Sequence, residues 1–192
     1  METIILTGLI GSGKSAVSAL LRERGIPVYD SDARTKALYD ESPVLVPALE
    51  AVLGISLRDR DGKLDRQALA AVIFANAQAR EQVEAVVYPA VLEDFLRWRK
   101  AHTHAPFVVL ESAVILSKPI FDGLADKVVL VTAPHEVRLQ RVVARDGLGE
   151  EAVLRRMDAQ RIPLDAVDAV ICNDGSLEQL RAAAERVFFP KK

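Results

Sequence analysis

Short continuous runs of apolar residues alternate along the chain with longer stretches in which apolar residues recur every three or four positions. The short runs predict strands, and the longer stretches predict helices such as the one ending before Gly25. Continuous rather than alternating runs are typical of strands covered on both faces, as in a parallel sheet. The pattern therefore predicts an α/β fold with a parallel five-stranded sheet flanked by helices. The predicted strands cover residues 4–7, 26–29, 107–110, 127–131 and 169–172.

The alternation stops between about residue 32 and residue 103, where no strand is predicted. Helical patterns there cover residues 43–53, 65–74 and 77–98. Pro89 lies inside the last pattern and predicts a kink or break near Tyr88. We therefore expect a core made of residues 1–32 and 104–192, with a helical insertion of residues 33–103 after the second strand.

Composition narrows the classes of protein that fit this pattern. Half of the 192 residues are hydrophobic, and the net charge is -2, which argues against a general nucleic-acid or membrane-surface binder. No apolar run approaches the roughly 20 residues of a membrane span, and the first residues lack the features of a signal peptide. The single cysteine, Cys172, suits a reducing compartment and is expected to be a small buried hydrophobe. We expect a cytoplasmic protein, monomeric or weakly homo-oligomeric, without nucleic-acid or membrane partners.

The strongest chemical signal is the sequence GLIGSGKS at residues 8–15, which fits the phosphate-loop pattern G-x-x-x-x-G-K-[ST]. It follows a predicted strand and opens a predicted helix, as the motif requires. Glycines let the backbone fold around an anion, and the start of the helix directs its positive dipole end to the same place. Lys14 adds a charge for the β- and γ-phosphates, and the Ser15 hydroxyl can ligate Mg²⁺. The predicted nucleotide site comprises Gly8, Gly11, Ser12, Gly13, Lys14, Ser15 and Ala16.

Carboxylates follow two of the predicted strands. Asp30 and Asp32 end the second strand and Glu111 ends the third, at the sheet edge where α/β proteins bind ligands. An aspartate beside the γ-phosphate can accept a proton from an attacking hydroxyl, and Glu111 could hold Mg²⁺ through water or contact the acceptor. Each of these acids could instead cap the helix that follows it, before Ala33 or near Ser112. Both interpretations remain open at this point.

Arginines gather after the fourth strand, where Arg138, Arg141 and Arg145 lie near one helix face. Guanidinium groups suit phosphate oxygens, and we expect at least one of Arg141 and Arg145 to touch phosphate. For any one of them, a solvated face paired with nearby acids is the alternative. The Arg-rich residues 145–163 could form a lid that excludes water from the nucleotide. Asn173, just past the last strand, could reach a nucleobase or simply form a turn.

Taken together, these residues resemble the dephospho-coenzyme A kinase family over most of the chain. The phosphate loop alone is shared by many kinases, but the ordered set of motifs is much more specific. That set comprises Asp30-Ser31-Asp32, Ile73-Phe74-Ala75-Asn76, Arg141, Arg145-Asp146, Arg156-Met157-Asp158-Ala159-Gln160 and Val167-Asp168-Ala169-Val170-Ile171-Cys172-Asn173-Asp174-Gly175. Three positions depart from the family pattern, with Leu9 for a glycine, Tyr88 for a histidine before proline, and Ser117 for an acid.

The resemblance implies a P-loop kinase core, a helical coenzyme-binding insertion and an arginine-bearing lid. It implies transfer of the γ-phosphoryl of ATP, with Mg²⁺, to the 3′-hydroxyl of dephospho-CoA, the last step of coenzyme A synthesis. Carried over by position, the expected catalytic residues are Asp32, Lys14 and Arg141. Arg145 is expected to act from the lid, and Asn173 is expected to lie near the adenine. The expected acceptor contacts are Asp30, Asp32, Tyr88, Glu111 and Arg141. The alternatives are another small-metabolite P-loop kinase and a nucleotide-binding module without transfer.

Overall fold

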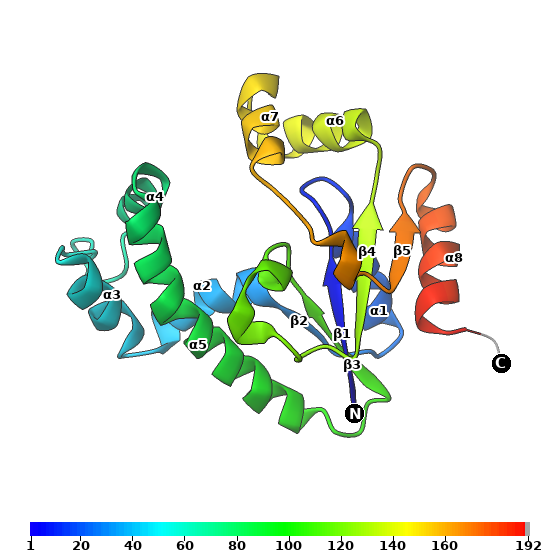
Figure 1. The fold of residues 1–192 in the computed structure, drawn as a ribbon, viewed down its shortest axis with the longest axis horizontal. Coiled ribbons are helices and arrows are strands. Elements are labelled where there is room, and N and C mark those ends of the chain that lie inside the picture. Colours follow the sequence, from blue (N-terminus) through cyan, green and yellow to red (C-terminus); the bar gives the residue numbers. More distant parts are fainter. Residues whose placement is uncertain (191–192) are drawn as a thin grey trace. The chain divides into compact units, whose positions relative to one another are not determined.

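The computed structural model describes residues 1–190 and contains a five-stranded sheet in the order β2-β3-β1-β4-β5 (Figure 1). All four strand pairs are parallel, which confirms the predicted fold class. The five strands overlap the five predicted runs and differ from them by two residues or fewer at either end. They are β1 (Glu2–Thr7), β2 (Val28–Asp30), β3 (Phe107–Glu111), β4 (Lys127–Thr132) and β5 (Ala169–Cys172).

Helices connect and flank the strands. None of those within residues 1–190 is both long and apolar enough to cross a membrane. The α-helices are α1 (Lys14–Glu23), α2 (Ser31–Glu41), α3 (Leu45–Leu53), α4 (Arg66–Ala75), α5 (Ala77–Ala101), α6 (His135–Asp146), α7 (Glu150–Asp158) and α8 (Leu177–Phe188). Short 3₁₀ turns occupy Ile115–Ser117, Pro119–Phe121 and Leu164–Ala166.

The chain packs as two compact units. One combines Met1–Asp30 with the residues from His102 onward and contains the sheet. The other is Ser31–Ala101 and contains helices α2 to α5, with one isolated antiparallel β-bridge between Arg58 and Leu64. The boundaries fall at the end of β2 and just before β3.

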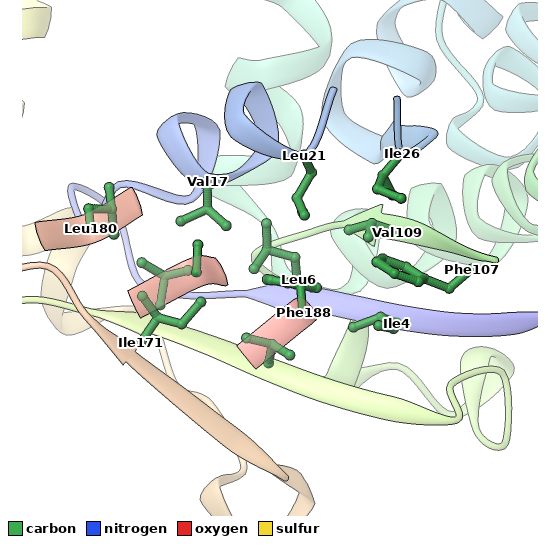
Figure 2. Packing of buried hydrophobic residues seen from close by; sticks show 13 residues of the cluster. Ile4, Leu6, Val17, Leu21, Ile26, Phe107, Val109, Ile171, Leu180 and Phe188 are labelled. Atoms are coloured by element: carbon green, nitrogen blue, oxygen red, sulfur yellow. The ribbon is translucent and has the colours of Figure 1, made fainter. Parts of the chain in front are cut away.

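One face of the sheet packs against α1 and α8, and Figure 2 shows the side chains that fill this layer. Alternate residues of each strand, such as Ile4 and Leu6 of β1, point toward Val17 and Leu21 of α1. Because successive strand residues point to opposite faces, this alternation directs one set of apolar side chains onto the two helices. The rings of Phe107 and Phe188 stack at a centroid distance of 6.1 Å and join the start of β3 to the end of α8.

The order of the strands determines where a ligand can bind. β1 and β4 are neighbours, but the chain after β1 crosses to β2 at one edge of the sheet, whereas the chain after β4 crosses to β5 at the other edge. This is a topological switch point, where open α/β sheets form a crevice at the carboxyl ends of the strands. The loop 8–13 begins at this point, and Glu111 is in register with Leu6 on one side and with Asp30 on the other.

Within the helical unit, α3 and α4 pack against the long helix α5. Of the kink or break predicted near Tyr88, the break is wrong, because α5 continues through Pro89 without interruption, and the kink stays a prediction. Proline has no N–H to donate to the carbonyl of Ala85, one turn earlier. Both residues are exposed, so water can satisfy that carbonyl and the helix can continue.

Two further expectations are corrected by the structure. No helix begins near Ser112, since the chain forms 3₁₀ turns only from Ile115 onward. Cys172 is exposed rather than buried. The reason is that β5 is the edge strand and, of its four residues, only Ile171 is fully buried, on the face that packs with α8.

Candidate phosphate-binding and catalytic site

The loop between β1 and α1 has, at two positions, a backbone conformation that residues other than glycine rarely adopt. Gly11 and Gly13 have φ values of 77° and 98°, in the left-handed region. A Cβ at Gly13 would lie 2.1 Å from Nδ2 of Asn173, and one at Gly11 would lie 2.6 Å from the carbonyl oxygen of Arg138. The glycines predicted to shape an anion cradle are therefore required by both conformation and space.

The donors of the loop converge at the start of α1. The Ser12 N–H donates to the Leu9 carbonyl at 3.1 Å and closes a tight turn. Lys14 begins the helix, and its Nζ donates to the Gly8 carbonyl at 2.7 Å, which holds the ammonium over the loop. The start of α1 adds the positive end of the helix dipole at the same place. The geometry fits the polyanionic tail of a nucleoside triphosphate.

Two side chains from other elements brace this loop. Nδ2 of Asn173 donates to the Ser12 carbonyl at 2.9 Å, and Asn173 is buried. Arg141 of α6 reaches the Gly11 carbonyl at 3.5 Å and Oδ1 of Asn173 at 3.4 Å. The structure thus brings both Asn173 and Arg141 to the loop backbone. Asn173 does more than form a turn, and Arg141 does more than lie on a solvated helix face. A contact between Asn173 and adenine stays a prediction.

Glu111 lies beside the start of α1 and is buried. Its Oε1 accepts from the Ser15 hydroxyl at 3.3 Å, and its Oε2 accepts from the Ser18 hydroxyl at 2.5 Å. The alternative that Glu111 caps a following helix is wrong. Hydroxyl and carboxylate oxygens are the ligands that Mg²⁺ prefers, so Ser15 and Glu111 fit a magnesium ion on the triphosphate. The sequence analysis missed Ser18, although its spacing of three from Ser15 places it on the same helix face.

The two aspartates of the second strand lie in different units. Asp30 ends β2, in register with Glu111, whereas Asp32 lies in the first turn of α2. Because α2 begins at Ser31, the alternative that Asp32 precedes and caps this helix is wrong. Arg34 holds α2 against α5 through a two-pronged ion pair with Asp94, at 3.0 and 3.1 Å. This pair fixes the position of Asp32 relative to the side chains of α5.

Tyr88 of α5 lies in the electrostatic environment of Asp32. Burial of the phenol, followed by the charge of Glu84 and a hydrogen bond to it, raises the pKa of Tyr88 above its ordinary value, and Asp32 adds to the shift. The phenol therefore stays neutral and can act as a hydrogen-bond donor beside two carboxylates. This cluster contains two of the predicted acceptor contacts, Asp32 and Tyr88.

The arginines of residues 145–163, the segment predicted to form a lid, are held differently from Arg141. Nε of Arg145 donates to its neighbour Asp146 at 2.7 Å, and this contact raises the pKa of Arg145. Arg145 therefore faces the lid itself rather than the loop. Arg138 is buried, its Nε donates to the Ala133 carbonyl at 3.2 Å, and desolvation lowers its pKa.

Comparison with known proteins identifies the family. The family model of dephospho-CoA kinase matches residues 2–179. A dephospho-CoA kinase from Porphyromonas gingivalis is 44% identical over 160 residues, which span 83% of this chain and 78% of that protein. The crystal structure of TT1252 from Thermus thermophilus is 37% identical and has a TM-score of 0.81, covering 97% of this chain and 96% of that one.

The fold is also that of a dephospho-CoA kinase from Campylobacter jejuni, with a TM-score of 0.69 at 24% identity over 98% of this chain and 96% of that chain. The phosphate loop, the strand order and these similarities all indicate the same family. The chain belongs to the dephospho-CoA kinase family and is an ATP-dependent phosphotransferase of the final step of coenzyme A biosynthesis.

Proposed function

We propose that this chain transfers the γ-phosphoryl of ATP to the 3′-hydroxyl of dephospho-CoA through the residues that the loop and the helical insertion present. The observation that carries the proposal is the braced phosphate loop, with Asn173 and Arg141 on its backbone and Glu111 beside Ser15. Such a loop recognises a triphosphate, and a carboxylate at the neighbouring strand end completes the site for its metal ion.

At the nucleotide, the loop amides, the start of α1 and Lys14 hold the β- and γ-phosphates. Ser15 and Glu111 would hold Mg²⁺, which when bound supplies positive charge to the triphosphate. Arg141, already at the loop, is placed to add a guanidinium to the negative charge that spreads over the transferring group. Arg145 would join from the lid by exchanging Asp146 for phosphate oxygens.

At the acceptor, we assign the role of general base to Asp32. Its carboxylate takes the proton of the 3′-hydroxyl while the oxygen of that hydroxyl forms a bond to the γ-phosphorus. The bond from this phosphorus to the bridging oxygen of the β-phosphate breaks, and ADP leaves. Asp30 would lie beside the acceptor with Glu111. The neutral Tyr88 would donate its single O–H to the acceptor in place of Glu84. In this assignment the helical unit, Ser31–Ala101, carries the acceptor.

The experiment that tests this assignment replaces one aspartate of α2 at a time. Asp32→Asn should lose about 10²–10⁴-fold in turnover, the contribution of a general base, while binding ATP as the unmodified protein does. Asp40→Asn is the matched control, because Asp40 lies on the same helix and pairs with Arg66 at the surface. Undiminished turnover in Asp32→Asn would remove this residue from the mechanism.

A panel of acceptors tests the substrate. ADP release with Mg²⁺-ATP should occur with dephospho-CoA and not with shikimate, gluconate or nucleosides. Turnover with one of those alcohols alone would indicate a different small-metabolite kinase. ATP binding without turnover on any acceptor would indicate a nucleotide-binding module. We further propose that the protein works in the cytoplasm as a monomer or weak homo-oligomer, without nucleic-acid partners, as the balanced charge and the single cysteine suggest.

A further inference from the structure

A side chain of the lid reaches the phosphate loop directly. Gln160 follows the end of α7, and its Oε1 accepts a hydrogen bond from the backbone N–H of Ile10 at 2.7 Å. The two residues are 150 positions apart, and both are partly buried. This distance is typical of a well-formed N–H···O bond.

The side chain of the same loop residue is held by the lid as well. Ile10 packs against the apolar cluster that α6 and α7 form together, consisting of Leu139, Val142, Val153 and Met157. Val153 and Met157 belong to α7, so the lid bonds to the backbone of Ile10 and also supplies part of the cluster against which its side chain packs. Ile10 is therefore a point at which the conformation of the lid and that of the loop depend on each other.

The bond to Gln160 also determines which amides the loop can offer. The Ile10 N–H is directed to Gln160, and the next turn closes through the bond from Ser12 N–H to the Leu9 carbonyl. Phosphate oxygens would then be bound by the other amides from Gly11 onward, in the cradle that the positive φ angles of Gly11 and Gly13 shape. A rotation of the Ile10 peptide would alter this turn and with it the direction of the amides that follow.

We propose that Gln160 is a positioning residue that fixes the phosphate loop in its nucleotide-binding form and couples it to the lid. The inference rests on the proposed nucleotide site and adds to it a residue that touches neither substrate. Its effect should appear in ATP binding rather than in the chemical step, because the bond shapes the loop equally before and during transfer.

The test compares two glutamines that accept the same kind of bond. Gln160→Met keeps the length of the side chain and removes the acceptor. Gln179→Met is the matched control, since Oε1 of Gln179 accepts from the Ser176 N–H at 2.7 Å in the cap of α8. Removing one such bond should raise the KM for ATP about 5-fold in Gln160→Met, with kcat unchanged. Gln179→Met should leave the KM for ATP as it is.

A double-variant cycle tests whether Gln160 acts through Ile10. Ile10→Ala weakens the packing of Ile10 in the lid cluster, and it should also raise the KM for ATP. If both changes act by releasing Ile10, the double variant should raise KM by less than the product of the two single effects. The proposal would be overturned if the two single effects on KM simply multiplied in the double variant, or if KM were unchanged in Gln160→Met.

Hydrogen exchange supplies a readout that does not depend on turnover. The Ile10 amide should exchange slowly in the unmodified protein without nucleotide, and it should exchange faster in Gln160→Met. An unprotected Ile10 amide in the unmodified protein would overturn the inference. If the unmodified protein instead protects this amide but fails to bind ATP, the proposed function fails while the contact between lid and loop stands.

Discussion

The side-chain amide of Asn173 donates a hydrogen bond of 2.9 Å to the backbone carbonyl of Ser12, 161 positions earlier in the chain. The bond links the turn after β5 to the middle of the phosphate loop, and the same nitrogen lies where a side chain at Gly13 would be. Asn173 therefore both supports the loop and excludes any residue larger than glycine from its last turn.

Replacing Asn173 by aspartate should weaken ATP binding. The shape of the side chain is kept, but a carboxylate cannot donate to the Ser12 carbonyl, which then lacks its partner beside a buried charge. Loss of such a bond costs about 1–3 kcal/mol, so the Kd for ATP should rise roughly tenfold or more. Calorimetric titration with Mg²⁺-ATP measures this change. An unaltered Kd would mean that the loop keeps its form without Asn173.

Gly13→Ala should abolish or strongly reduce nucleotide binding, because the added Cβ meets Nδ2 of Asn173 at 2.1 Å. Gly54→Ala is the control, since Gly54 also has a positive φ, of 67°, but no atom lies within 4 Å of an added Cβ. Left-handed backbone strain should cost both variants about 1–2 kcal/mol of unfolding free energy. Gly13→Ala should lose more, because of the close approach to Asn173. Only Gly13→Ala should fail to bind ATP, as measured by equilibrium binding. Equal ATP affinity in the two variants would contradict the close approach at Gly13.

Glu111→Gln should raise the concentration of Mg²⁺ needed for half-maximal rate. Glutamine can still accept from the Ser18 hydroxyl, but the negative charge beside Ser15 is lost. Removing one charged ligand should weaken Mg²⁺ binding roughly tenfold. Initial rates measured over a series of Mg²⁺ concentrations at saturating ATP give this value. If the Mg²⁺ dependence of the rate were the same as in the unmodified protein, Glu111 would not contribute to Mg²⁺ binding.

Tyr88 should ionise above its ordinary pKa of 10.0, because burial and the Glu84 and Asp32 carboxylates disfavour the phenolate. The folded protein holds this proton more tightly than the unfolded chain. The resulting stabilisation is present below pH 10.0 and is lost as the pH rises through the folded-state pKa. Relative to Tyr88→Phe, the unmodified protein should therefore lose unfolding free energy above pH 10.0.

Denaturant unfolding of both proteins at several alkaline pH values checks this expectation. Phenolate absorbance, taken as the difference between the two proteins, should show one tyrosine that titrates late. A difference spectrum that titrates at the ordinary value would mean that Tyr88 is solvated and distant from the two carboxylates.

Phe188→Ala should destabilise the sheet-containing unit by about 3–5 kcal/mol, the usual cost of removing a buried phenyl ring. Phe188 is buried and stacks on Phe107 at the far end of the helix layer from the phosphate loop. Thermal unfolding measures the loss. At a temperature where the variant remains folded, the KM for ATP should not change, and a large change would show that the helix layer affects the loop.

Local patterns in the chain were sufficient for much of the architecture. Apolar runs predicted β1, β3, β4 and β5 closely, because side-chain periodicity reports which faces are buried. The weaker run at 26–29 became the short strand β2, which starts two residues later and ends one residue later. The break expected at Pro89 did not occur, because the cost of proline in a helix depends on whether water can reach the carbonyl it leaves unpaired, and that depends on packing.

The phosphate loop was predictable for a related reason. Its conformation depends on local sequence, because the glycines, the lysine and the hydroxyl residue all lie within residues 8–15, where a helix begins. The roles of Glu111, Asn173 and Arg141 were left with alternatives, because a strand-end acid or a surface arginine has the same local sequence whether it binds a ligand or caps a helix. Their positions depend on strands and helices that are distant in the chain.

The sequence by itself determined the fold class, the family and the chemistry of the anion cradle, all of which depend on the identity and spacing of neighbouring residues. Only the tertiary structure decided which side chains hold that cradle. Asn173, Arg141 and Gln160 reach it from 130 to 161 positions away. Contacts of that separation arise from the parallel pairing of strands and the packing of the lid helices, and no local pattern encodes them.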